Sequence, residues 1–234
     1  MMKLSEEMLR DVRERLPQFA DGRRLEHIYA VEQECGNLAK LFLVYPSLFS
    51  SEDELRLRLA ALLHDLTKQK TMEEQLALCS ALKIRLTPYE RVTKKVLHAK
   101  TGAELARRLL DKWFGRIDGL EPVFSAVLCH TTGKADMTLI EKLLYLADYI
   151  EPTRTFSDCQ LLRQRFYQDI QEAGACQNTM LARLDEVLLL AFDLTIKDLL
   201  ENEKLIHEDT LAGRNFILYS RMTSAACGSE YNRM

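Results

Sequence analysis

Helix start signals recur along the chain and constrain its fold more than any other feature of the sequence. In a capping box, a Ser or Thr and a Glu three residues later satisfy backbone N–H groups that the first helical turn leaves unpaired. Four pairs have this spacing: Ser51–Glu54, Thr71–Glu74, Thr87–Glu90 and Thr138–Glu141. Pro88 follows Thr87 at the favoured first helical position. Pro152 is placed to end the helix that begins near Thr138. The sequence therefore predicts helices joined by short connections.

Apolar residues recur at helical spacing between these signals, as in the face formed by Leu55, Leu59, Leu62 and Leu63 and the face formed by Leu139, Leu143, Leu146 and Ile150. Further helices are expected over about 4–16, 24–45, 90–113, 120–130, 158–173 and 178–200. Phe216–Tyr219 is the only short β-like run, and it fits the end of a helix equally well. We predict an all-α fold with one helical domain over residues 1–222 and a small, polar, mobile tail over 223–234.

Composition excludes several classes of protein. The net charge is -3, so no overall basic field attracts nucleic acid or an anionic membrane, although local basic groups can still bind phosphates. The N-terminus is too charged for a signal peptide, and no apolar run approaches the roughly 20 residues of a membrane span. None of the six cysteines are spaced as a short zinc-binding pair. We expect a reduced, cytoplasmic protein without nucleic-acid or membrane partners, and a homodimer is an open alternative to a monomer.

Histidine and aspartate residues in apolar segments are the candidates for chemistry. The chain has five histidines, and His64 is followed by Asp65 directly after the apolar run LRLRLAALL. Asp148 lies in a second apolar run, KLLYLADYI. Carboxylates are rarely buried without compensation, and a metal ion supplies it. Taken singly, each residue has a plainer interpretation as a surface, hydrogen-bonded or salt-bridged side chain. The ordered set predicts one metal site if several helices pack around a point: His27, His64, Asp65, His98, His130 and Asp148.

This ordered set resembles the H…HD…D signature of HD-domain metal phosphohydrolases, with His98 and His130 matching the branch whose site holds two metals. The block HTTGKADMTLIEKLLYLADYIEPTR, residues 130–154, resembles the YqeK family of symmetrical diadenosine-tetraphosphate hydrolases. ALLHDLTK (61–68) and HAKTGAELA (98–106) are similar to the same family. The resemblance covers roughly residues 20–218 and implies an HD-domain helical bundle with a dinuclear metal site in its core.

The resemblance also implies a division of the ligands between two metals. His27, His64, Asp65 and Asp148 would surround one metal, and Asp65 would bridge to a second held by His98 and His130. Nitrogen and oxygen ligands suit iron, manganese, cobalt, nickel or zinc, and the family implies iron. The implied reaction is hydrolysis of the dinucleotide to two ADP by a metal-activated water. The alternatives are another nucleotide substrate, namely a nucleoside mono- or triphosphate or (p)ppGpp, and a non-catalytic nucleotide-sensing module.

Further residues around this set are predicted to act on the substrate. Asp65 and Lys68 are the predicted catalytic residues. The predicted substrate-binding residues are His27, Asp65, Lys68, His98, His130, Thr131, Asp148, Arg154 and His207. The Thr132-Gly133 turn offers further donors to phosphate.

Several of these residues have a second interpretation. Lys68 either contacts a phosphate or is a solvated lysine, and Arg154 either clamps a phosphate or lies on the surface. His207, with Ile206 and Thr210, either lines the nucleotide pocket or has no part in it. Arg23 and Arg24 form either an entrance patch or the polar face of a helix. Trp113 and Phe114 are interpreted as core anchors rather than as base-stacking residues.

Overall fold

The structure is a computed structural model that describes residues 2–172 and 176–230. Its helices are α1 (Glu6–Arg15), α2 (Gly22–Phe42), α3 (Ser51–Leu63), α4 (Met72–Ala81), α5 (Lys94–Phe114), α6 (Glu121–Cys129), α7 (Leu139–Ile150), α8 (Ser157–Glu172), α9 (Gln177–Glu201) and α10 (Glu208–Glu230). Two 3₁₀ turns occupy Leu16–Gln18 and Glu90–Val92. Within the described ranges, β structure is limited to one isolated bridge between Met2 and Ile117. The predicted all-α class is confirmed.

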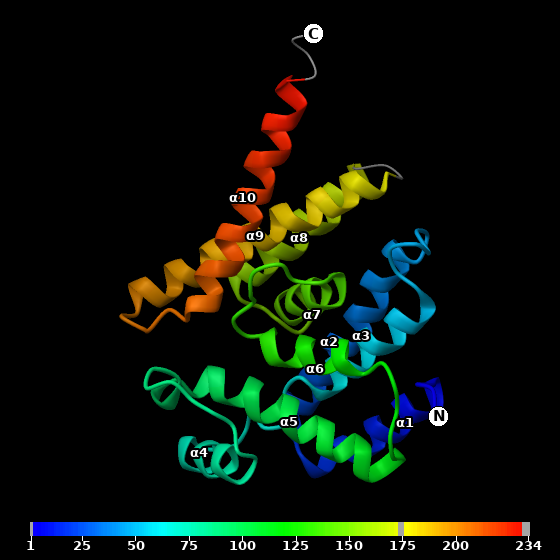
Figure 1. The fold of residues 1–234 in the computed structure, drawn as a ribbon, viewed down its shortest axis with the longest axis vertical. Coiled ribbons are helices and arrows are strands. Elements are labelled where there is room, and N and C mark those ends of the chain that lie inside the picture. The colour runs from blue at the N-terminus through cyan, green and yellow to red at the C-terminus, as the bar shows by residue number, and fades with distance from the viewer. Residues whose placement is uncertain (1, 173–175, 231–234) are drawn as a thin grey trace.

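The helices form a bundle around α7, which lies in the middle of the molecule (Figure 1). α3 packs against α2, α6 and α7, and α5 packs against α6. α8 and α9 lie side by side above this bundle, and α10 packs on α9 and projects away from the body (Figure 1). α7 carries buried apolar side chains around most of its circumference, at Leu143, Leu144, Leu146 and Ile150. A helix that is apolar on nearly all sides is stable only in the interior, so α7 is the centre of the fold.

Two of the four predicted capping pairs begin α-helices, and the other two differ from the prediction. Thr71–Glu74 and Thr138–Glu141 form the predicted boxes at α4 and α7. α3 is capped one residue earlier than predicted, by Ser50 and Asp53, because the shorter Asp carboxylate bonds the Ser50 backbone N–H at 3.0 Å. Both reciprocal bonds also join Thr87 and Glu90. These bonds precede only the 3₁₀ turn Glu90–Val92, however, because non-helical Thr93 separates that turn from α5.

The C-terminal part of the chain is more helical than predicted. α10 contains the β-like run Phe216–Tyr219 and continues to Glu230, so the helical part extends past residue 222. The backbone over 223–230 follows α10 rather than forming a separate tail, and residues 231–234 of the predicted tail lie outside the described residues. Among the described residues, no helix combines the length and apolar character that crossing a membrane requires.

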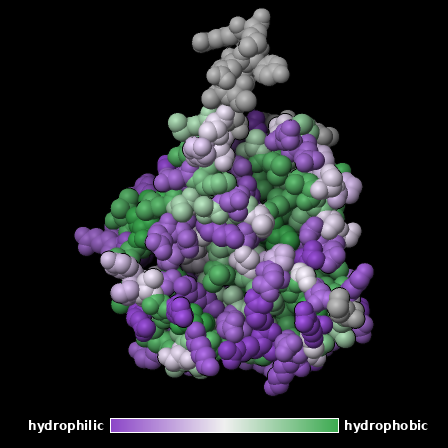
Figure 2. Space-filling model, viewed as in Figure 1, coloured by the Kyte–Doolittle hydropathy of each residue, from purple (hydrophilic) through white to green (hydrophobic). Residues whose placement is uncertain are grey.

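Other expectations about packing are confirmed. Trp113 makes an edge-to-face contact with Phe19 at 6.1 Å between centroids, and Trp113 and Phe114 pack against the core. Cys35, Cys79, Cys129 and Cys159 are free and buried, where they act as small apolar side chains, whereas Cys176 is exposed. The surface that faces the viewer mixes hydrophilic and hydrophobic residues (Figure 2).

A buried polar network fixes the turn after α3 against α5. The Thr67 hydroxyl donates to the carbonyl oxygen of His98 at 3.0 Å and lies 2.8 Å from the Thr101 hydroxyl. Thr101 also lies 2.6 Å from Oε1 of Gln75, whose amide donates to the carbonyl oxygen of Thr67 at 2.5 Å. All three side chains are buried. Because every member has a partner, the network joins the segment after Asp65 to the helix that carries His98.

Replacing Thr101 with valine should destabilise the protein by about 2 kcal/mol, because the buried hydroxyl of Thr67 loses a partner and Oε1 of Gln75 loses the hydroxyl that donates to it. For a chain of this size, that loss lowers the melting temperature by about 4–8 °C, measured by scanning calorimetry. Thr101→Ser keeps the hydroxyl and should melt close to wild type. Thr223→Val is the matched control. The hydroxyl of Thr101 also donates to the carbonyl oxygen of Leu97, four residues earlier, and the hydroxyl of exposed Thr223 donates in the same way to that of Tyr219. Equal melting of both valine variants would contradict the prediction.

Candidate metal centre

Five segments that are distant in sequence bring six potential ligands to one point. α2, α5 and α7 each carry one inside the helix, and the ends of α3 and α6 carry the rest immediately after the last turn. The fold thus assembles all six residues that the sequence predicts as metal ligands, in two groups of three: His27, His64 and Asp148, and Asp65, His98 and His130. Within each group, one ligand atom from every residue lies within 4.8 Å of the others.

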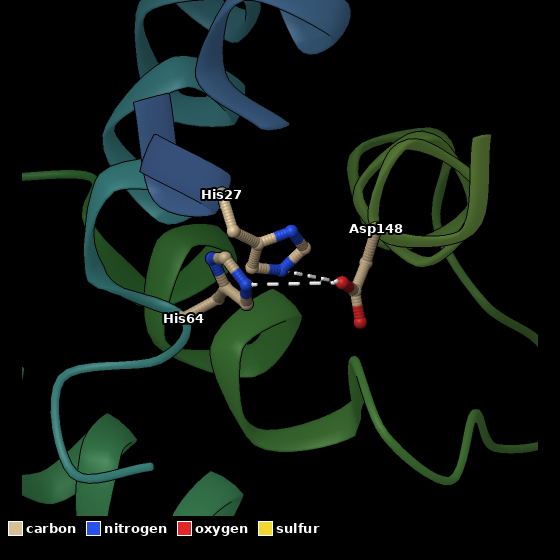
Figure 3. A group of neighbouring side chains, drawn as sticks. All are labelled: His27, His64 and Asp148. Carbon is tan, nitrogen blue, oxygen red and sulfur yellow. Dashed lines mark ion pairs between the residues drawn. The ribbon is translucent and has the colours of Figure 1, made fainter. Parts of the chain in front are cut away.

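The first group is centred on Asp148. Oδ1 of Asp148 lies 2.9 Å from Nε2 of His27 and 4.0 Å from Nε2 of His64. Figure 3 shows both imidazole rings directing a nitrogen toward this carboxylate from different elements. Two imidazole nitrogens and one carboxylate oxygen at such separations leave room for a metal ion between them.

The second group shares its carboxylate with the first. Oδ1 of Asp65 lies 3.2 Å from Nε2 of His98 and 3.6 Å from Nε2 of His130. The other oxygen, Oδ2, lies 3.8 Å from Nε2 of His27 and 3.4 Å from Nε2 of His64. Asp65 therefore presents one oxygen to each group, which is the arrangement that a bridging carboxylate requires.

Hydrogen bonds on the outer side of the rings fix three of the histidines. Nδ1 of His64 donates to the carbonyl oxygen of Ala61 at 2.6 Å, and Nδ1 of His130 donates to that of Val127 at 2.7 Å. Nδ1 of His27 donates to Oε1 of Glu151 at 3.0 Å. Each ring then directs the lone pair of Nε2 into the centre, which is how backbone and carboxylate acceptors orient metal-binding histidines.

Burial and charge set the protonation states of the ligands. Burial acts to raise the pKa of Asp148, but the nearby His27 ring and the charge of Arg154 outweigh it and hold that pKa well below its usual value. The pKa of Asp65 is also well below its usual value, because His64 and Lys68 outweigh the effect of burial. Burial lowers the pKa of His64 and brings the pKa of His98 to about 3. Ionised carboxylates and neutral imidazoles are the forms that bind metals.

The ligand atoms themselves indicate that a cation belongs in the centre. Among the described residues, Nε2 of His27, Nε2 of His64 and Oδ1 of Asp65 are buried without a hydrogen-bond partner. Buried polar atoms are normally satisfied, and such exceptions require an explanation. These three atoms face the two groups described above, so the residues present fit a pair of metal ions.

Three cationic side chains surround the two aspartates. Arg24 donates to Oδ2 of Asp65 at 2.5 Å, and Arg154 donates to Oδ1 of Asp148 at 2.7 Å. Nζ of Lys68 lies 3.1 Å from Nε2 of His98 and 3.7 Å from Oδ1 of Asp65. Lys68 and Arg154 are therefore half-buried and contact the candidate ligands. Arg24 is at the site, whereas Arg23 is exposed.

A cleft of about 560 Å³ opens above the centre. The predicted residues that line it are Lys68, His130, Thr131, Thr132, Asp148, Arg154, Ile206, His207 and Thr210. The Thr131 hydroxyl lies 3.2 Å from Nε2 of His130 and 3.3 Å from Nε2 of His98. Nε2 of His207 lies 3.2 Å from Oε1 of Glu90, so this histidine joins the loop before α10 to the turn before α5. The Thr132-Gly133 turn is confirmed: Gly133 has φ +65°, and a Cβ there would clash with the ring of Phe192.

The sequence reasoning missed one buried residue that orients a ligand. Glu151 is fully buried, accepts from His27, and accepts from the backbone N–H of Thr153 at 2.6 Å and its hydroxyl at 2.7 Å. A signal was available, because Glu151 follows Asp148 by three residues on the same helix and immediately precedes Pro152. Tyr89 and Phe156 also line the cleft, and no pattern in the sequence marks them.

Replacing Glu151 with glutamine should lower the metal affinity of the His27 group by about 10–100-fold. Glutamine has one acceptor oxygen, so it cannot accept from both His27 and the Thr153 backbone, and its NH₂ must face one of these donors. The affinity is measured by competition with a chromophoric chelator. Glu34→Gln is the matched control, since Glu34 is also buried on an α2 face and accepts from Tyr167 at 2.6 Å. Equal metal affinities of the two variants would refute this role of Glu151.

Known proteins are similar to this chain in sequence and in fold. The HD domain family matches residues 24–153, a range that contains all six ligands and Glu151. The symmetrical bis(5'-nucleosyl)-tetraphosphatase of Halalkalibacterium halodurans is 30% identical over 83% of this chain and 89% of its own length. The protein of the same name from Staphylococcus aureus is 25% identical over 92% of this chain and 95% of its own.

A solved structure shows the same fold. It comes from Clostridium acetobutylicum and is described as a predicted HD superfamily hydrolase involved in NAD metabolism. It matches with a TM-score of 0.70 and 27% identity, and covers 94% of this chain and 100% of that chain. This chain therefore belongs to the HD domain family, among the hydrolases that resemble the symmetrical bis(5'-nucleosyl)-tetraphosphatases.

Proposed function

We propose that this chain hydrolyses diadenosine tetraphosphate symmetrically to two ADP, using two metal ions held by the six ligands. The observation that carries the proposal is Asp65, which offers one carboxylate oxygen to each ligand group at the base of the cleft. The names of the relatives described above support the substrate.

The charges of the site suit a polyphosphate. Two ionised aspartates and neutral histidines would leave two divalent ions with a net positive charge, which attracts the phosphates of the substrate. Ions held there would supply Lewis acidity, which stabilises charge on phosphate oxygens and lowers the pKa of water. The ligands fix the position of that charge, because the outer hydrogen bonds of His27, His64 and His130 prevent their rings from turning.

The cationic side chains would take part in binding and cleavage. Arg154 and Arg24 now donate to Asp148 and Asp65, and with cations at those carboxylates their donors are free to bind phosphate oxygens. Lys68 is half-buried beside Asp65 and His98. We assign it the catalytic role of stabilising the ADP leaving group as a point charge, and assign Thr131 and His207 to the wall that contacts the substrate.

The experiment that tests the proposal resolves the products. Protein purified without chelator should convert diadenosine tetraphosphate into ADP alone, followed by anion-exchange chromatography. In ¹⁸O-labelled water, one oxygen label should enter one of the two ADP molecules per cleavage. ATP plus AMP, or no turnover, would count against the proposal. Higher kcat/KM for a nucleoside mono- or triphosphate or for (p)ppGpp would favour the alternative substrate class.

The metal and the cellular setting extend the proposal. Nitrogen and oxygen donors without thiolate support iron, manganese, cobalt, nickel or zinc, and we favour iron. Elemental analysis of the purified protein tests this, with close to two metals per chain expected. We further propose a cytoplasmic enzyme that acts on a small molecule without nucleic acid, consistent with the net charge of -3, and a homodimer, tested by light scattering.

A further inference from the structure

Two exposed aromatic residues line the cleft that contains the metal centre. The Tyr89 side chain is 71% exposed and that of Phe156 is 68% exposed, and both contribute to the cleft lining. Among the described residues, the three most exposed aromatic residues are these two and Tyr219. Tyr219 is 67% exposed and lies on α10, outside the cleft lining. Ring faces exposed inside a charged cleft are typical of sites that stack nucleobases.

Each aromatic residue is connected to a different ligand group. Tyr89 immediately precedes the 3₁₀ turn that leads into α5, the helix that carries His98, and Thr93 and Lys95 continue the cleft lining from this segment. Phe156 follows Arg154 by two residues in the connection between α7 and α8, and Arg154 is bonded to Asp148. The two rings thus belong to the segments that carry the second and the first ligand group, respectively.

Apolar side chains accompany the rings in the cleft lining. The contact between His207 and Glu90 joins the segment of Leu205 and Ile206 to the turn of Tyr89. Figure 2 shows hydrophobic side chains gathered over the end of α9 and the start of α10, where Leu205 is exposed. At the end of α7, the Tyr149 hydroxyl lies 2.6 Å from that of Thr195 on α9. The neighbours of Thr195 on this helix, Leu194 and Leu199, also line the cleft. Apolar surface exposed in a cleft is typical of a ligand site.

We propose that Tyr89 and Phe156 each stack one base of the dinucleotide, on opposite sides of the metal centre. The inference rests on the proposed function, because symmetrical cleavage places the two central phosphates at the metals and one nucleoside diphosphate on each side. A stacking platform at each end holds the substrate with its midpoint at Asp65. Because every base has a π-face, this recognition is tolerant of base identity.

Kinetics of single variants test the proposal. Tyr89→Ala and Phe156→Ala should each raise KM for diadenosine tetraphosphate about tenfold, while kcat stays within about twofold, since a stacked base is bound equally in the ground and transition states. Tyr89→Phe and Phe156→Tyr keep a ring and should restore the wild-type KM. Tyr219→Ala removes an equally exposed ring from α10 and should leave KM unchanged. Unchanged KM in both cleft alanine variants would overturn the proposal.

Equilibrium binding separates this proposal from the proposed function. ADP and inorganic pyrophosphate are titrated calorimetrically into the metal-bound wild type and the Tyr89→Ala/Phe156→Ala double variant. The Kd for ADP should rise at least about tenfold, while the Kd for pyrophosphate, which has no base, should change less than about twofold. Parallel changes in both would overturn the stacking role.

If the wild type fails to cleave the dinucleotide but the double variant selectively loses ADP, the proposed function fails and base stacking stands. If the wild type cleaves the dinucleotide and the variants match it in KM and in ADP binding, the proposed function stands and base stacking fails.

Discussion

Replacing Asp65 with asparagine is expected to lower kcat/KM for the dinucleotide by about 1,000-fold and the metal content from close to two ions per chain to one or fewer. The carboxylate lies between the two ligand groups, with one oxygen directed to each. Asparagine keeps the shape but has one neutral oxygen in place of two anionic ones. Loss of electrostatic stabilisation worth several kcal/mol corresponds to a rate decrease of this size.

Activity and metal content should be measured on the same samples of the Asp65 variant, by product chromatography and elemental analysis. Asp193→Asn is the matched control, because Asp193 on α9 pairs with Arg214 outside the cleft lining, and the variant should retain full activity and both ions. Two bound metals and near-normal turnover in Asp65→Asn would show that another group joins the metals and that the assignment of Asp65 is wrong.

Removing the metals with a chelator should abolish turnover and lower the melting temperature by about 11–22 °C. Each ion at a hundredfold excess over its Kd stabilises the native state by about 2.7 kcal/mol, so two ions contribute about 5.4 kcal/mol, and each kcal/mol corresponds to about 2–4 °C in a chain of this size. The metal-free protein should remain folded, because Arg24, Lys68 and Arg154 compensate the two aspartates as the structure shows. Differential scanning fluorimetry with and without chelator gives the shift.

Restoring the metal should restore both activity and melting temperature. In Asp65→Asn the shift caused by the chelator should be smaller than in wild type, since fewer ions leave. If the chelator leaves the melting temperature of the wild type unchanged, the cluster of histidines and aspartates is a hydrogen-bonded network without metal.

The sequence predicted most helices because their signals are local. Capping pairs and apolar spacing act within one or two turns, so Thr71 and Thr138 cap helices in the structure where the sequence predicts them. The differences from the prediction also have local causes. Asp53 rather than Glu54 forms the capping box of α3, and non-helical Thr93 delays the helix expected from residue 90. For the segment of α10, the sequence left Phe216–Tyr219 open between a β-like run and the end of a helix, and in the structure this helix packs on α9.

The sequence by itself determined which residue types were available for a metal centre: His64-Asp65 after an apolar helix, and Asp148 in another, predicted buried charge that needs a cation. Only the tertiary structure decided how these residues divide into two ligand groups. The two oxygens of Asp65 face different ligand groups because α3 packs between α2, α6 and α7, a contact among segments far apart in the chain. Glu151, Tyr89 and Phe156 acquire their places in the same way. Long-range packing depends on the summed burial of many side chains, and no short motif encodes it.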